Sequence, residues 1–96
     1  MWVYLNDRFV TKEEAVVSVF DHGFLYGDGI YETLRAYDGR FFMLQHHLAR
    51  LHRSGRMIGL QIPIPDKNWT QLLQEAVGRN NLKDAYLRIT VSRGEG

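Results

Sequence analysis

The run IYETLRAYDGRFFM, residues 30–43, carries the strongest structural signal in the chain. Residues 30–37 have the composition of a β-strand, and Asp38-Gly39 separates them from the aromatic run 40–43. An Asp-Gly pair between two such runs favours a two-residue turn, because both central positions of that turn need positive φ angles. We therefore predict a β-hairpin over residues 30–43.

Alternation along this first strand divides its side chains between two faces. One face carries Tyr31, Thr33, Arg35 and Tyr37; the other carries Ile30, Glu32, Leu34 and Ala36. We interpret Glu32 as a local hydrogen-bonding partner, with Arg35 as the candidate, and assign it no catalytic role.

Two amphipathic helices are expected after the hairpin. Residues 44–60 place leucines and an isoleucine at helical spacing, and Pro63 and Pro65 stop that helix. Residues 69–79 form the second helix, with Asp66 or Asn68 as its N-cap.

Strand patterns account for the two ends of the chain. Residues 2–5 and 8–10 flank Asn6-Asp7 and predict a short hairpin, and residues 85–91 predict a closing strand. The glycines at 23, 27 and 29 are expected to break regular structure, and we interpret Gly27-Asp28-Gly29 as a tight turn, not a phosphate loop. Since strands and helices do not alternate strictly, we expect an α+β fold: a small domain with a mainly antiparallel sheet and two helices packed on one side.

Composition narrows the function classes. The 96 residues suit one small domain, with 45% hydrophobic residues and a net charge of +1. That charge balance argues against binding to nucleic acid or to an anionic membrane surface. The chain has no cysteine and no visible signal peptide, so a cytoplasmic protein is expected. The histidines lack the spacing of a metal site, so no metal is predicted.

Two segments bring glycines, aromatic residues, acids and one arginine into a specific order. They are Asp21-His22-Gly23-Phe24-Leu25-Tyr26-Gly27-Asp28-Gly29-Ile30-Tyr31-Glu32 and His47-Leu48-Ala49-Arg50-Leu51. Together they resemble the N-terminal region of the class IV (fold type IV) pyridoxal-phosphate enzymes, which include branched-chain and D-amino-acid aminotransferases and aminodeoxychorismate lyase. The resemblance extends from about Val3 to Gly96.

The resemblance implies roles for five residues. Arg50 matches the arginine that binds the phosphate of pyridoxal 5'-phosphate, a task suited to a guanidinium because its planar fork can bind phosphate oxygens bidentately. Tyr26 and Tyr31 match positions that help form the substrate pocket, Tyr26 reaching into the site of a partner subunit. Tyr86 and Arg88 alternate on the last predicted strand, share a face, and match a Tyr-x-Arg pair that takes the substrate α-carboxylate in branched-chain aminotransferases.

The lysine that holds the cofactor in this family lies further along the chain than residue 96. Lys12, Lys67 and Lys83 occupy polar turn or helix-end settings and match no family motif. We therefore expect residues 1–96 to be the N-terminal small domain of a longer enzyme, inactive by itself.

The resemblance implies a homodimeric aminotransferase that moves an amino group between a branched-chain amino acid and 2-oxoglutarate. Tyr86 and Arg88 favour this subfamily, whereas Glu32-Thr33-Leu34-Arg35 and Val91-Ser92-Arg93-Gly94 are closer to the D-amino-acid enzymes or to 4-amino-4-deoxychorismate lyase. The lyase is therefore one alternative. A free-standing, non-catalytic binding domain is the other.

Overall fold

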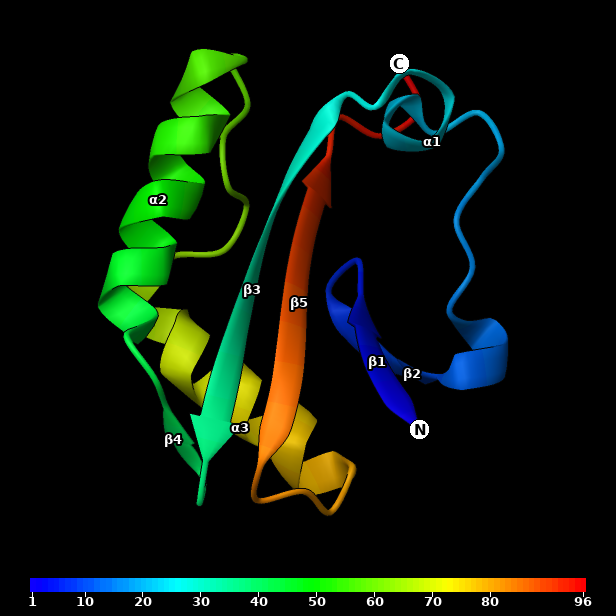
Figure 1. Cartoon of the computed structure of the whole chain (residues 1–96). Helices are drawn as coiled ribbons and strands as arrows, with labels where there is room; N and C mark the ends of the chain where they lie inside the picture. The colour runs from blue at the N-terminus through cyan, green and yellow to red at the C-terminus, as the bar shows by residue number, and fades with distance from the viewer.

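The computed structural model describes residues 1–96 and contains five strands and three α-helices. The strands are β1 (Trp2–Leu5), β2 (Arg8–Thr11), β3 (Gly29–Tyr37), β4 (Arg40–Phe41) and β5 (Ala85–Ser92). The α-helices are α1 (His22–Tyr26), α2 (Leu44–Met57) and α3 (Trp69–Arg79), and short 3-10 turns are η1 (Lys12–Glu14) and η2 (Asp66–Asn68). β3 lies between β4 and β5 in an antiparallel sheet, and β1 and β2 form a separate hairpin (Figure 1).

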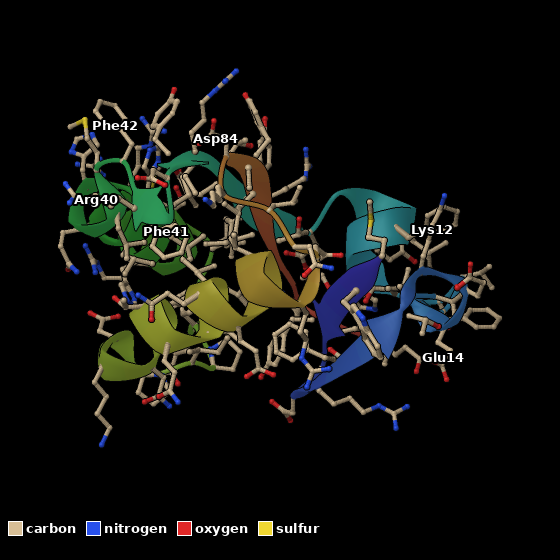
Figure 2. The ribbon with its side chains drawn as sticks, turned by 90° about the horizontal axis from the view of Figure 1, so that it is seen from below. Lys12, Glu14, Arg40, Phe41, Phe42 and Asp84 are labelled. Carbon is tan, nitrogen blue, oxygen red and sulfur yellow. The ribbon has the colours of Figure 1, made fainter.

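The predicted hairpin at Asp38-Gly39 is confirmed. Both residues have positive φ angles, 51° and 77°, and Tyr37 pairs with Arg40 across the turn. The end of the hairpin lies beside Asp84, in the loop before β5 (Figure 2). The Asp84 carboxylate accepts a 2.8 Å hydrogen bond from the Asp38 N–H. The second strand, β4, is shorter than expected. Residues 42 and 43 are not part of it, because the chain turns directly into α2.

The N-terminal hairpin is also confirmed, with Asn6 and Asp7 at positive φ in its turn. It is held against α3 by Asn80, whose side chain accepts a 2.7 Å hydrogen bond from the Trp2 N–H and donates one of 3.0 Å to the Trp2 carbonyl. Arg79 lies over the Trp2 ring, with 5.1 Å from the guanidinium carbon to the ring centroid.

The core lies on one face of the sheet, between the strands and the two longer helices, as predicted for an α+β domain (Figure 1). Its buried cluster consists of Leu34 and Ile89 from the sheet, Leu48 and Leu51 from α2, and Trp69 and Leu73 from α3. Leu51 has no exposed surface. Burial of these side chains is the main term that holds the helices on the sheet.

The ends of the helices differ from the sequence predictions. α2 ends at Met57, three residues early, because Gly59 adopts a left-handed conformation (φ 68°) and the Leu60 N–H bonds back to the Gly55 carbonyl at 2.8 Å. Asn68, one of the two predicted caps, does occupy the N-cap position of α3, but its side chain makes no capping hydrogen bond. η2 leads into the helix, and the Trp69 N–H bonds the Asp66 carbonyl instead.

Residues 21–27 form a short helix where the glycines were expected to prevent one. Asp21 caps α1 by accepting hydrogen bonds from the N–H groups of Gly23 (2.7 Å) and Phe24 (3.3 Å). Gly27 then ends the helix at φ 67°, a conformation that favours glycine. A side-chain cap at one end and a glycine at the other are sufficient for a single helical turn.

Candidate functional site

A buried carboxylate lies at the contact between β3 and α2. Glu32 is only 5% exposed and faces the helix-covered side of the sheet, between Ile30 and Leu34 along the strand. Arg50 and His47 of α2 reach it from one helical turn, since residues three apart share a helix face.

The three side chains form a closely bonded group. Arg50 donates from Nε to Glu32 Oε2 and from Nη2 to Oε1, each at 3.0 Å, and His47 Nδ1 lies 2.8 Å from Oε1. An ionised carboxylate can only accept, so His47 carries its proton on Nδ1. Burial alone would raise the pKa of Glu32, but the hydrogen bonds from Arg50 and His47 outweigh it and hold that pKa below its ordinary value. The same pairing raises the pKa of Arg50.

The arrangement leaves part of the Arg50 guanidinium free. Of its five N–H groups, the two that point at Glu32 occupy the edge formed by Nε and Nη2. The Arg50 side chain is 48% exposed, whereas Glu32 beneath it is buried. The two N–H groups on Nη1 make no hydrogen bond in the structure, so they remain as donors for a second anion.

Three other predicted site residues lie together on the opposite, exposed face of the sheet. Tyr31 comes from β3, and Tyr86 and Arg88 come from β5; the register pairs Tyr31 with Thr90 and Arg35 with Tyr86. Arg88 stacks over the Tyr31 ring at 4.1 Å, and Arg35 stacks over the Tyr86 ring at 4.6 Å.

This face combines two aromatic rings with two guanidinium groups. Neither guanidinium pairs with a carboxylate; the side chains that do so in the structure are His47, Arg50, His52, Arg79 and Arg93. Arg35 and Tyr86 also line a shallow hollow of about 220 Å³. Arg88 also donates from Nε to Thr90 Oγ1 at 3.3 Å, and the remaining N–H groups of the two guanidinium groups are available for a carboxylate.

Tyr26 lies apart from both groups, at the end of α1, with 73% of its surface exposed. Its ring forms a T-shaped pair with the His22 ring, with 5.2 Å between the centroids. Two side-chain hydrogen bonds help to anchor this loop to the end of β5. Ser92 donates to Asp21 at 2.9 Å and lowers the Asp21 pKa, and Arg93 donates to Asp28 at 2.7 Å.

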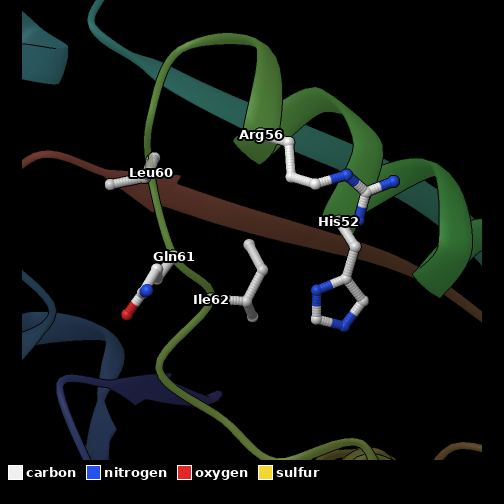
Figure 3. A pocket seen from close by; sticks show the side chains of 5 residues that line it. All are labelled: His52, Arg56, Leu60, Gln61 and Ile62. Atoms are coloured by element: carbon white, nitrogen blue, oxygen red, sulfur yellow. The ribbon is translucent and has the colours of Figure 1, made fainter.

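The chain therefore distributes the predicted residues over three places. Tyr31, Tyr86 and Arg88 come together, whereas Arg50 lies on the other side of the sheet and Tyr26 at its end. A hollow of about 290 Å³, formed by His52 and Arg56 of α2 and residues 60–62, is lined by none of the five predicted site residues (Figure 3). In this hollow His52 Nε2 lies 2.7 Å from Asp66 Oδ1.

The expected pairing of Glu32 with Arg35 is wrong. Their odd separation along β3 places the two side chains on opposite faces, and Glu32 instead bonds Arg50 and His47. His47 was not assigned a role from the sequence. The sequence did carry a signal for this role. Glu32 lies on an apolar face of its strand, so its carboxylate needs a buried polar partner, and the His-x-x-Arg spacing on the following amphipathic helix offers two such partners on one helix face.

The structure contains no group of three or more residues able to hold a metal ion, and none of its helices meets the length and apolarity needed to cross a bilayer.

The chain is similar to known proteins in sequence. Residues 29–96 match the protein-family model described as "Amino-transferase class IV". The chain is 48% identical over 96 residues to a "Putative branched-chain-amino-acid aminotransferase" of Methanocaldococcus jannaschii, covering all of this chain and 33% of that protein. It is 39% identical over 94 residues to a D-alanine aminotransferase of Listeria innocua, covering 98% of this chain and 32% of that protein.

The fold agrees with these relatives. A branched-chain aminotransferase from the archaeon Thermoproteus uzoniensis, solved with norvaline, superposes with a TM-score of 0.83 at 37% identity, over 94% of this chain and 32% of that one. The chain thus spans about a third of the length of the proteins that it matches. With the family model covering most of the sequence, the chain belongs to the class IV aminotransferases.

Proposed function

We propose that residues 1–96 are the N-terminal small domain of a pyridoxal 5'-phosphate-dependent enzyme that moves an amino group between a branched-chain amino acid and 2-oxoglutarate. The chain is about a third as long as its relatives, which is consistent with a second domain that carries the cofactor lysine. The lysines of this chain, Lys12, Lys67 and Lys83, are all exposed. A cofactor lysine needs an enclosed site, and none of these three positions is enclosed.

The Glu32–Arg50 pair carries the proposal. Arg50 is anchored at one edge and half-exposed, and its Nη1 edge has the planar geometry that binds phosphate oxygens. These residues fit a phosphate monoester, and Arg50 would hold the phosphate of the cofactor. The bound cofactor would supply the electron sink for the reaction.

The exposed face of β3 and β5 would contribute to substrate binding. Arg88 and Tyr86 would take the substrate carboxylate, and the Tyr31 ring, which already stacks against Arg88 at 4.1 Å, would border the apolar side chain. Since Arg50 lies on the other side of the sheet, the remainder of the enzyme would have to enclose both surfaces.

A homodimer is part of the proposal. The segment before and within α1 exposes a series of large apolar side chains: Val16, Val17, Val19, Phe20, Phe24, Leu25 and Tyr26. An exposed group of apolar side chains of this kind is typical of an interface, and Tyr26 at its end would reach the site of the second subunit. Light scattering of the intact protein, with Phe20→Ser and Tyr26→Ser as variants, tests this; a wild-type monomer would contradict it.

The function is tested by incubating the intact protein with leucine, 2-oxoglutarate and pyridoxal 5'-phosphate and measuring glutamate. Arg50→Lys keeps the charge but lacks the fork, so it should raise the cofactor concentration needed for half-maximal rate. Arg53→Lys, an exposed position on the same helix, is the matched control and should behave as wild type. Failure of the wild-type protein to form glutamate would eliminate this function.

The alternative is 4-amino-4-deoxychorismate lyase, favoured by the similarity of Glu32-Thr33-Leu34-Arg35 and Val91-Ser92-Arg93-Gly94 to that branch. Release of pyruvate and 4-aminobenzoate from 4-amino-4-deoxychorismate, without glutamate from leucine, would assign it. A protein that performs neither reaction and does not bind the cofactor would be a non-catalytic binding domain.

A further inference from the structure

Glu32 is a charged residue buried between β3 and α2, beside the apolar core. Its side chain is 6% exposed, and both carboxylate oxygens accept hydrogen bonds, Oε2 from Arg50 and Oε1 from Arg50 and His47. A buried charge is costly unless it is fully paired, so an acid here needs a reason that packing does not supply.

The reason lies in what the pair does to the arginine. Arg50 has a long side chain with many rotamers, and its exposed half gives it freedom to move. Two parallel hydrogen bonds to a buried carboxylate fix both the position and the plane of the guanidinium. His47 holds the same carboxylate from the adjacent side and is itself largely buried.

We propose that Glu32 is a positioning residue for anion binding by Arg50: it fixes the guanidinium so that its Nη1 edge faces an incoming phosphate, and His47 secures Glu32. This inference rests on the proposed function, because it takes the anion to be the phosphate of the cofactor.

Positioning and simple electrostatics predict opposite results. Glu32 is an anion next to the binding edge, so through-space repulsion alone would make phosphate binding tighter when the carboxylate is replaced by a neutral amide. Positioning predicts weaker binding, because the amide cannot hold both N–H groups of the Arg50 fork with the same strength.

The experiment measures two dissociation constants in the intact protein after removal of cofactor, one for pyridoxal 5'-phosphate and one for pyridoxal, which lacks the phosphate. Their ratio reports the phosphate contact and requires no turnover. The variants are Glu32→Gln, Arg50→Met and the double variant. A global folding defect would weaken both ligands together and leave the ratio unchanged.

We expect Arg50→Met to lower the preference for the phosphorylated ligand by about a hundredfold and Glu32→Gln to lower it by about tenfold. Glu32→Gln should add little in the Arg50→Met background, because a positioning residue acts through the group that it positions. A preference unchanged or increased in Glu32→Gln would overturn the inference while leaving Arg50 in its role. If Arg50→Met retains the wild-type preference, the assignment of Arg50 itself fails.

Glu32→Asp provides a second test if the amide variant does not fold. It keeps the negative charge but withdraws the carboxylate by one methylene, so that it no longer reaches the fork of Arg50. Positioning predicts a reduced preference for the phosphorylated ligand in this variant too. A wild-type ratio in Glu32→Asp would overturn the inference.

Discussion

Helices α2 and α3 each contain one glycine, and replacing them by alanine should change stability in opposite directions. A Cβ at Gly55 in α2 would lie 2.5 Å from the carbonyl oxygen of Leu60, closer than the 3.0 Å below which real Cβ contacts are essentially never found. A Cβ at Gly78 in α3 would meet no atom within 4 Å. Alanine gains about 1 kcal/mol over glycine in a helix interior, and Gly78→Ala should show most of that gain.

At Gly55 the same gain is outweighed. Overpacking a fixed contact costs about 1–3 kcal/mol, and moving Leu60 away also weakens the 2.8 Å hydrogen bond from its N–H to the Gly55 carbonyl, which contributes about 1 kcal/mol. We expect Gly55→Ala to lower the free energy of unfolding by about 2 kcal/mol. The two variants should then differ by roughly 3 kcal/mol, or about 10–25 °C in Tm for a domain of this size.

Urea unfolding followed by tryptophan fluorescence measures both variants, since Trp69 is buried in the core and reports its exposure. Hydrogen exchange at the end of α2 provides a local reading for Gly55→Ala. If both substitutions stabilise the chain by similar amounts, the close approach of residues 55 and 60 is refuted.

Three further predictions concern single side chains. Glu32→Gln should lower the free energy of unfolding by about 2 kcal/mol near neutral pH, less than for a fully buried ion pair because one partner is half-exposed. Since the folded-state pKa of Glu32 lies below its ordinary 4.5, that contribution is present above about pH 4.5 and is lost as pH falls through the lower value. Urea titrations at several pH values should therefore show the difference in unfolding free energy between wild type and variant decreasing in acid. A difference that does not change with pH would contradict the pairing. Leu51→Ala should cost about 3 kcal/mol because the side chain is fully buried, whereas Leu82→Ala, about half-exposed, should cost less than about 0.5 kcal/mol by the same titration. Gly39→Ala should cost about 1 kcal/mol, because its φ of 77° disfavours a Cβ, and a thermal scan that shows no loss would argue against the turn.

The local elements could be predicted because their causes lie within a few residues. Asp38-Gly39 and Asn6-Asp7 specify turns through the φ angles that they tolerate, and both hairpins form as predicted. The spacing of leucines places Leu48 and Leu51 in the core, and the alternation along β3 puts Tyr31 and Leu34 on opposite faces of the strand.

The site was only partly predictable. The family resemblance singled out Arg50 and the exposed residues Tyr31, Tyr86 and Arg88, and the pairing of β3 with β5 brings the last three together. No local rule places Arg50 on the opposite side of the sheet from Tyr31, since that depends on which face α2 covers.

By itself the sequence determined the turns, the apolar faces of the helices and the family, since each depends on residue types at short and regular spacing. Tertiary structure alone decided that Glu32 pairs with Arg50 and His47, and that a methyl group is tolerated at Gly78 but not at Gly55. The physical reason is distance along the chain. Glu32 and Arg50 are eighteen residues apart, and their contact exists only because α2 packs against β3.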